Sequence, residues 1–195
     1  MQNWILASRP KTLYASISPV IVGLSLSFKD GDLNYLVALV TILASVLIQI
    51  GSNFANDLYD FLKGSDRNDR IGPTRMTQSG EISPYKMKLA MYIIFCFALL
   101  LGCYLAWEGG WIIVFIGISS ILSAILYTGG PYPFGYYGWG DFFVFIFFGL
   151  IAVSGTYFLQ RGVFSFESLL LGIAIGSLST AILIVNNIRD VEEDA

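Results

Sequence analysis

The chain has 195 residues, of which 55% are hydrophobic and 13% are charged. A water-soluble domain of this length usually has about twice that charged fraction, so the composition excludes a soluble monomer and indicates an integral membrane protein. The chain contains no histidine, which excludes a Ser-His-Asp triad, an HExxH zinc site and a histidine-ligated haem. Its net charge of −3 argues against a nucleic-acid partner.

The chain contains six apolar stretches of the kind that form membrane-spanning helices, each of which needs about 20 residues. They cover residues 12–28, 35–54, 87–107, 111–128, 142–158 and 168–188. The first stretch lacks a small-residue cleavage site, so we do not interpret it as a signal peptide. Glycines within the stretches, such as Gly23, Gly117 and Gly149, predict places where helices pack closely. The sequence therefore predicts a single all-α domain over residues 1–195, a multi-span transmembrane helical bundle.

The distribution of charge predicts the orientation of these spans. With the N-terminus in the cytoplasm, all of the 11 Lys and Arg residues except Lys29 and Arg161 fall on the cytoplasmic side. Cytoplasmic loops of membrane proteins are enriched in Lys and Arg, so we expect this orientation. Most of the 14 Asp and Glu residues fall on the same side, which places the polar chemistry at the cytoplasmic face. The long polar stretch 55–85 on that face is a candidate lid over a site.

The second span ends in a polar face. This face consists of Gln49, Asn53, Asn56 and Asp60. Their spacing of four, three and four residues places them on one side of a helix, with Asp57 at its edge. Amide and carboxylate groups at membrane depth are costly unless they bind something, so we predict a ligand site here. The alternative is a solvated and capped helix end.

A second acidic cluster ends the sixth span. Asn186, Asp190 and Asp194 are spaced by four residues and project from one side of a helix. Alone, this cluster would be typical of a solvated tail, but two such clusters at the cytoplasmic ends of spans predict carboxylates that converge across a bundle. Oxygen donors without histidine or thiolate suit Mg²⁺, which bridges carboxylates to phosphates. We therefore predict a magnesium-dependent intramembrane site for an isoprenoid diphosphate.

Several motifs resemble one family of membrane enzymes. Residues 56–60, Asn-Asp-Leu-Tyr-Asp, and residues 64–66, Gly-Ser-Asp, resemble the first aspartate-rich motif of the UbiA-type intramembrane aromatic prenyltransferases. Residues 190–194 resemble the second motif of that family. The stretches 7–12, 70–80 and 127–136 are similar to one branch, the 1,4-dihydroxy-2-naphthoate polyprenyltransferases of menaquinone biosynthesis. The resemblance covers essentially the whole chain.

This resemblance implies transfer of a polyprenyl group from a polyprenyl diphosphate to an aromatic acceptor, 1,4-dihydroxy-2-naphthoate, which loses its carboxylate as carbon dioxide. It implies Mg²⁺ as the cofactor, contact with membrane lipid, and the inner membrane of a bacterium as the location. The family fold has nine transmembrane helices, of which this sequence contains six. The resemblance therefore implies an incomplete prenyltransferase domain that is unstable alone.

The resemblance also implies roles for individual residues. The catalytic residues are Asp57, Asp60, Asp190 and Asp194. The metal ligands are Asn56, Asp60, Asp66, Asp190 and Asp194. Arg75 matches the family's loop arginine that contacts the diphosphate, and Lys63, Arg70 and Arg189 are further candidate diphosphate contacts because they are cations near the acidic clusters. The acceptor pocket is lined by Asn53, Tyr127, Tyr136 and Asp141. Asp141 stands where the family is expected to have a glutamate, which shortens its reach by one methylene.

Three other functions remain open at this point. The chain could belong to another branch of the same family that uses a different acceptor, or it could be a truncated member without catalytic activity. It could also be an ion transporter or channel, whose intramembrane carboxylates would carry ions; such proteins often contain internal repeats, and we find no convincing repeat here. Release of diphosphate that depends on Mg²⁺ would separate the enzyme from the transporter.

Overall fold

The computed structural model describes residues 1–64 and 75–190, without the side chains of residues 189 and 190. In chain order the helices are α1 (Gln2–Ser8), α2 (Pro10–Lys29), α3 (Tyr35–Lys63), α4 (Pro84–Gly109), α5 (Trp111–Leu126), α6 (Gly140–Val144), the π-helix η1 (Phe145–Ile151), α7 (Ala152–Arg161) and α8 (Phe166–Asp190). The described residues contain no strand, which confirms the predicted all-α fold.

Among the described residues, five helices are long and apolar enough to cross a membrane. They are α2, α3, α4, the continuous helix Gly140–Arg161 formed by α6, η1 and α7, and α8 over Phe166–Ile188. The fourth predicted span is shorter than expected, because α5 has 16 residues and is therefore about 24 Å long. A bilayer core is about 30 Å thick. The helix ends before Gly130, whose φ of 78° is outside the helical region, and before Pro131, which has no amide hydrogen to continue it.

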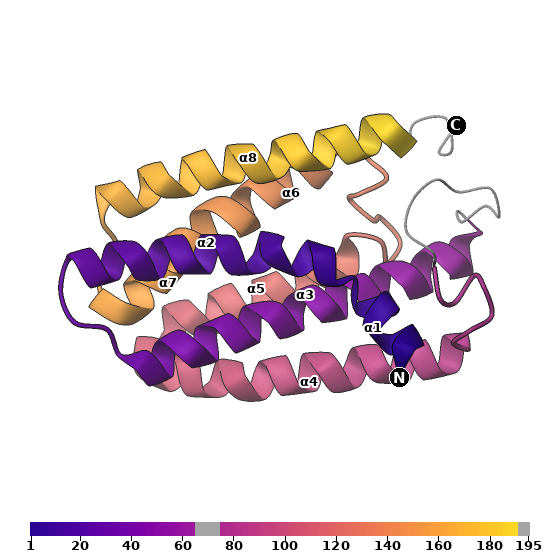
Figure 1. Cartoon of the computed structure of the whole chain (residues 1–195), viewed down its shortest axis with the longest axis horizontal. Helices are drawn as coiled ribbons and strands as arrows, with labels where there is room; N and C mark the ends of the chain where they lie inside the picture. The colour runs from indigo at the N-terminus through magenta and orange to yellow at the C-terminus, as the bar shows by residue number, and fades with distance from the viewer. Residues whose placement is uncertain (65–74, 191–195) are drawn as a thin grey trace.

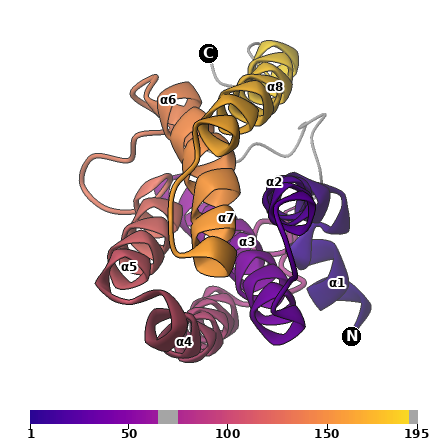
Figure 2. The ribbon, with the colours of Figure 1, turned by 90° about the vertical axis from the view of Figure 1, so that its left-hand side faces the viewer.

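The helices lie side by side with alternating direction along one axis (Figure 1). The C-terminal ends of α3 and α8 lie at the same end of the bundle, together with α1; we call this the motif end. Seen along the bundle, α7 lies centrally, and it contacts α2, α3, α4, α5 and α8 (Figure 2). The end of α3 carries the first acidic motif, and the end of α8 leads into the second. Both helix ends therefore lie at the motif end of the bundle.

The length of α3 places its polar face at the edge of the apolar layer. The helix begins where the Asn34 side chain accepts hydrogen bonds from the amides of Leu36 and Val37, and it ends at Gly64, which has a φ of 70°. Its 29 residues give a length of about 44 Å, which exceeds the thickness of a bilayer core. Its last two turns, which include Asp57 and Asp60, can therefore reach the membrane surface.

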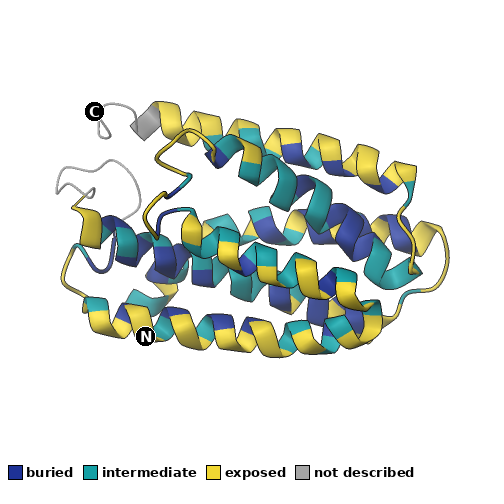
Figure 3. Cartoon of the chain, turned by 180° about the vertical axis from the view of Figure 1, so that it is seen from behind, coloured by how far each residue is buried: buried dark blue, intermediate teal, exposed yellow. Residues whose placement is uncertain are grey.

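The outward faces of the helices are apolar. Figure 3 shows exposed residues along the outer sides of the bundle, and they include Leu100, Phe115 and Leu178. Water would disfavour so much exposed apolar surface, whereas lipid accepts it, and the helices satisfy their own backbone hydrogen bonds. The prediction of an integral membrane protein is therefore confirmed.

Glycines allow the backbones of η1 and α8 to approach each other closely. A Cβ added at Gly149 would lie 2.5 Å from the carbonyl oxygen of Gly172 and 2.5 Å from the Cα of Gly176. Both are backbone atoms and cannot rotate away. A Cβ at Gly23 would likewise meet the Val153 carbonyl oxygen at 2.6 Å. The predicted close packing is confirmed at these glycines but not at Gly117, where an added Cβ would meet nothing within 4 Å.

Replacing Gly149 with alanine should therefore push η1 and α8 apart. We expect Gly149→Ala to lower the free energy of unfolding by about 1–3 kcal/mol, measured by thermal or denaturant unfolding of the full-length protein in detergent. Gly102→Ala is the matched control, because Gly102 is a glycine in α4 around which an added Cβ would meet nothing within 4 Å. Equal losses of stability in the two variants would contradict the proposed contact.

Candidate active site

The Asp57 carboxylate anchors the segment that leads into α4. Asp57 is 1% exposed. Its Oδ2 accepts a hydrogen bond from the backbone amide of Met76 at 2.9 Å, and its Oδ1 accepts one from the amide of Thr77 at 2.9 Å. Hydrogen bonds from backbone amides stabilise a buried carboxylate and fix the position of the donating segment. Asp57 therefore holds residues 76 and 77 against the end of α3, and its predicted catalytic role stays a prediction.

The Asp60 carboxylate joins three segments of the chain. It lies about one helical turn beyond Asp57 and is 5% exposed. Its Oδ2 forms an ion pair with Nη2 of Arg75, which is 7% exposed. Its Oδ1 accepts a hydrogen bond of 2.6 Å from the Tyr136 hydroxyl. The contacts bring α3, the segment before α4 and the connection between α5 and α6 together at one acidic group.

The connection between α5 and α6 is also bound to two other residues of α3. The Thr128 hydroxyl donates a hydrogen bond of 2.9 Å to Oδ1 of Asn56. Lys63 donates from Nζ to the backbone oxygen of Thr128 at 2.6 Å, and the same Nζ lies 5.0 Å from the centroid of the Tyr136 ring. At that distance the cation is attracted to the face of the ring. The connection therefore lies against the polar end of α3.

Gly129 allows this contact. A Cβ at this position would lie 2.8 Å from a ring carbon of Tyr59 and 2.7 Å from the backbone oxygen of Ile125. A larger residue would force the connection away from α3. The glycines in the stretch 127–136 thus have a packing role as well as a turn-forming one.

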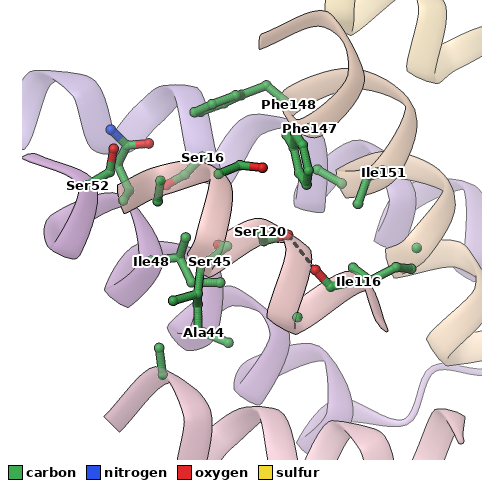
Figure 4. A pocket seen from close by; sticks show the side chains of 18 of the residues that line it. Ser16, Ala44, Ser45, Ile48, Ser52, Ile116, Ser120, Phe147, Phe148 and Ile151 are labelled. Carbon is green, nitrogen blue, oxygen red and sulfur yellow. Dashed lines mark hydrogen bonds between the residues drawn. The ribbon is translucent and has the colours of Figure 1, made fainter. Parts of the chain in front are cut away.

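A cavity of about 540 Å³ lies inside the bundle, next to this cluster. The helices α2, α3, α5, η1 and α7 all contribute to its lining. Figure 4 shows Phe147, Phe148 and Ile151 of η1 opposite Ser16 and Ser45. The hydroxyls of these two serines donate to backbone oxygens of their own helices, so their polarity is largely satisfied. The cavity has the size and the mainly apolar lining of a small-molecule site.

One end of the cavity is polar and lies beside the acidic motif. Asn53 lines it and donates from Nδ2 to the backbone oxygen of Ser8 at 2.8 Å and to the Thr12 hydroxyl at 2.9 Å. Tyr127, the first residue after α5, lines the same cavity. Burial raises the pKa of the Tyr127 hydroxyl to about 12, and the carboxylates of Asp141 and Asp60 add to this increase. Tyr127 therefore stays protonated at neutral pH and can donate a hydrogen bond.

The profile described as the UbiA prenyltransferase family matches residues 16–195, which is most of the chain. The chain belongs to the UbiA prenyltransferase family.

Individual members of this family are similar over nearly the whole chain. The 1,4-dihydroxy-2-naphthoate octaprenyltransferase of Escherichia coli (strain K12) is 41% identical over 201 residues, which cover 99% of this chain and 65% of that protein. The protein of the same name from Haemophilus influenzae is 39% identical, covering 100% of this chain and 66% of that protein. UbiA prenyltransferase domain-containing protein 1 of Danio rerio is 32% identical, covering 98% of this chain and 57% of that protein. The chain thus spans just under two thirds of the length of these bacterial UbiA relatives.

The structure brings some of the expected UbiA site residues together. Asn56, Asp60, Lys63 and Arg75 meet at the end of α3, together with Tyr136. Of the predicted acceptor-pocket residues, Asn53 and Tyr127 are among the described residues that line the cavity. Tyr136 and Asp141 are not among them. Tyr136 instead contacts Asp60, and the backbone oxygen of Asp141 accepts a long hydrogen bond of 3.4 Å from the Thr180 hydroxyl.

Other expected UbiA site residues lie outside the part of the chain that the structure describes. These are Asp66, Arg70 and Asp194, together with the side chains of Arg189 and Asp190. Within the described residues, no group of three or more carboxylate, thiol or imidazole side chains could hold a metal ion. The predicted convergence of the two acidic motifs therefore stays a prediction, although the helices α3 and α8 end at the same end of the bundle (Figure 1).

Sequence reasoning missed two residues near the end of α3 and the cavity. Thr128, which contacts Asn56 and Lys63, lies in a stretch that resembles the UbiA branch, but it was not assigned a role. Arg9 lines the cavity; it is one of the predicted cytoplasmic charges and belongs to the stretch 7–12 that resembles the UbiA branch, but it has no predicted site role of its own. Its position directly before Pro10 indicates a break in the helix at Arg9, because proline disfavours the right-handed helical conformation in the residue that precedes it. This break separates α1 from α2.

Proposed function

We propose that the protein transfers a polyprenyl group from a polyprenyl diphosphate to 1,4-dihydroxy-2-naphthoate, a step in menaquinone biosynthesis. The observation that carries this proposal is the position of the Asp60, Arg75 and Tyr136 cluster, one helical turn along α3 from Asn56, which lines the cavity. A charged headgroup can thus bind at the cluster while apolar groups occupy the cavity. The names of bacterial relatives that are up to 41% identical support the same substrates.

The donor atoms at the end of α3 fit Mg²⁺. Asn56 and Asp60 are four residues apart on one helix face and offer only oxygen. The chain has no histidine, and its two cysteines, Cys96 and Cys103, are exposed on α4. We propose Asn56, Asp60, Asp66, Asp190 and Asp194 as the ligands. When bound, Mg²⁺ supplies positive charge that stabilises the diphosphate as it leaves.

The residues of this chain have two tasks in the proposed reaction. Arg75 and Lys63 lie beside Asp60 and supply positive charge for the diphosphate. Arg75 is buried, and a buried group that faces developing charge is more effective than the same group in water. The second task is to exclude water, which would hydrolyse a carbocation-like centre. The Asp57-anchored segment and the connection between α5 and α6 cover the end of α3 and perform this task.

The proposed chemistry balances without a further reactant. The allylic carbon–oxygen bond of the diphosphate breaks, and its electron pair leaves with the diphosphate. The ring carbon that carries the carboxylate uses a pair of ring electrons to form the new carbon–carbon bond. The bond to the carboxylate then breaks, its electrons restore the aromatic ring, and carbon dioxide leaves. No oxidant or external base is consumed.

We propose that the motif end faces the cytoplasm in the inner membrane of a bacterium. Arg9, Lys63 and Arg75 lie at or beside this end, whereas Lys29 and Arg161 lie at the far ends of α2 and α7. This difference follows the enrichment of Lys and Arg in cytoplasmic loops. The diphosphate would then enter from the aqueous side and the polyprenyl chain from the apolar layer.

The test uses membranes that contain the full-length protein. With a polyprenyl diphosphate, Mg²⁺ and naphthoate labelled in its carboxylate, we expect prenylated product, diphosphate and labelled carbon dioxide in equal amounts. EDTA should stop all three, and added Mg²⁺ should restore them. Membranes of the same host without the protein are the control. Ion flux without release of diphosphate would indicate a transporter, and prenylation of a different acceptor in preference would indicate another UbiA branch.

A further inference from the structure

The cavity contains a cation that the proposed transfer mechanism does not use. Arg9 is the one charged side chain among the described residues that line it. The other described lining residues carry apolar side chains, hydroxyls, amides or, at Cys103, a thiol. Arg9 is half-buried, so its guanidinium is partly withdrawn from water and interacts more strongly with an anion. The cavity is therefore suited to a molecule that is largely apolar and carries one negative group.

The backbone of Arg9 is held in an unusual conformation. Its φ of 49° is the only positive φ among the described non-glycine residues. Its backbone oxygen accepts hydrogen bonds of 2.9 Å from both the amide and the hydroxyl of Thr12. The preceding residue, Ser8, is held by Asn53. A left-handed conformation is uncommon in a long side chain and is retained where the surrounding structure fixes it, often at a binding site.

Arg9 and Asp60 serve different regions of the site. The backbone of Arg9 lies near Asn53, because Asn53 donates hydrogen bonds to Ser8, directly before Arg9, and to Thr12, three residues after it. Asn53 precedes Asp60 by seven residues of α3, which is about 10 Å along the helix. A diphosphate bound at Asp60 and an anion bound at Arg9 would therefore not compete for one position. A single guanidinium would also balance a single carboxylate better than the several charges of a diphosphate.

We propose that Arg9 binds the carboxylate of the aromatic acceptor and thereby determines how the acceptor ring is oriented in the cavity. This inference rests on the proposed function, since it assigns a role within the same reaction. The planar guanidinium can form two parallel hydrogen bonds with a carboxylate, which fixes direction as well as position. Apolar walls from η1, including Phe147 and Phe148, would then contact the ring.

The first test measures binding, so it does not depend on turnover. The probes are 1-hydroxy-2-naphthoate and 1-naphthol, which differ in the carboxylate, titrated against the purified full-length protein. Arg9→Asn removes the cation with a residue that tolerates a positive φ. We expect it to weaken binding of the naphthoate by about 10- to 100-fold and to leave binding of the naphthol unchanged. Arg9→Lys should recover part of the affinity, because it restores the positive charge but not the two parallel hydrogen-bond donors of the guanidinium.

Two further variants keep the test decisive. Lys11→Gln is the matched control, because Lys11 is an exposed cation two residues away that does not line the cavity; we expect no change in either affinity. Arg9→Gly removes the cation with a residue that favours a positive φ and replaces Arg9→Asn if the latter fails to fold. Equal weakening of both probes, or unchanged binding of the naphthoate, would overturn the proposal.

Steady-state kinetics separate this proposal from the proposed function. If both hold, Arg9→Asn raises the KM for the naphthoate and leaves the KM for the polyprenyl diphosphate unchanged. A raised KM for the diphosphate alone would show that Arg9 serves the other substrate and would overturn the inference, while the transferase function stands. Absence of prenyl transfer in the wild-type protein would refute the function, and the two binding probes would still report on Arg9.

Discussion

Replacing Asp60 with asparagine should lower the rate of prenyl transfer by about 100- to 1,000-fold, the size of effect seen when one electrostatic group of an active site is removed. The amide keeps the shape of the side chain and can still accept the hydrogen bond from Tyr136. It loses the negative charge that pairs with Arg75 and that would attract a divalent cation. The measurement is kcat for the full-length protein in membranes with Mg²⁺. Asp32→Asn, at an exposed acid near the opposite end of the bundle, is the control and should be unchanged.

The buried ion pair adds a second effect that must be separated from the first. Arg75 is 7% exposed, and removing its partner leaves a buried charge, which costs about 3–5 kcal/mol in comparable cases. The double variant Asp60→Asn with Arg75→Gln removes both charges and should recover much of this stability without recovering activity. Recovery of both would show that Asp60 has only a structural role. Wild-type turnover in the single variant would contradict the proposed site.

Replacing Asp57 with alanine should release the segment before α4. The amides of Met76 and Thr77 would lose their buried acceptor, so we expect their hydrogen exchange to accelerate by about 10- to 100-fold. Turnover should fall as well, because this segment carries Arg75. Hydrogen exchange of the full-length protein, read by mass spectrometry on peptides that cover residues 75–82, provides the measurement.

A neighbouring acid provides the control for Asp57→Ala. Glu81 lies on the same segment, is exposed, and accepts a hydrogen bond of 2.7 Å from Nδ2 of Asn3. Exposed hydrogen bonds of this kind contribute little, so Glu81→Gln should change neither exchange nor turnover appreciably. If Asp57→Ala abolished turnover while the exchange of Met76 and Thr77 stayed slow, Asp57 would act on the substrate or the metal rather than as an anchor.

The sequence patterns that predicted the helices were strong because their physical cause is local. Long apolar stretches form helices in a membrane regardless of their neighbours, since each helix forms all of its backbone hydrogen bonds internally. The four-three-four spacing of polar residues correctly placed Asn53, Asn56 and Asp60 along one side of α3, facing the cavity or the connection after α5. The short helix α1 was not predicted, because its seven residues are too few to form an apolar stretch of the length that a membrane span needs.

The contacts of the candidate site were less predictable because they depend on distant segments. The partners of Asp57 are backbone amides, which have no signature in the sequence. The ion pair between Asp60 and Arg75 joins residues whose separation in the chain says nothing of their distance in space. The conformation of Arg9 is fixed in part by Asn53, which follows it by 44 residues and holds the adjacent residue. Such contacts follow from the packing of α1, α2 and α3 rather than from any one stretch.

The π-helix η1 makes the number of residues in its segment as important as their chemical character. A π-helix closes its hydrogen bonds over five residues instead of four, so it accommodates extra residues without interrupting the helix. Deleting one residue from η1 would let the segment return to ordinary α-helical winding and would remove its widened turn, while α6 and α7 kept nearly the same orientation. Phe147 and Phe148 lie in that turn and line the cavity, so the deletion would move both side chains around the helix axis and change the cavity wall. Substitutions in this segment can therefore be tolerated where a change of length cannot.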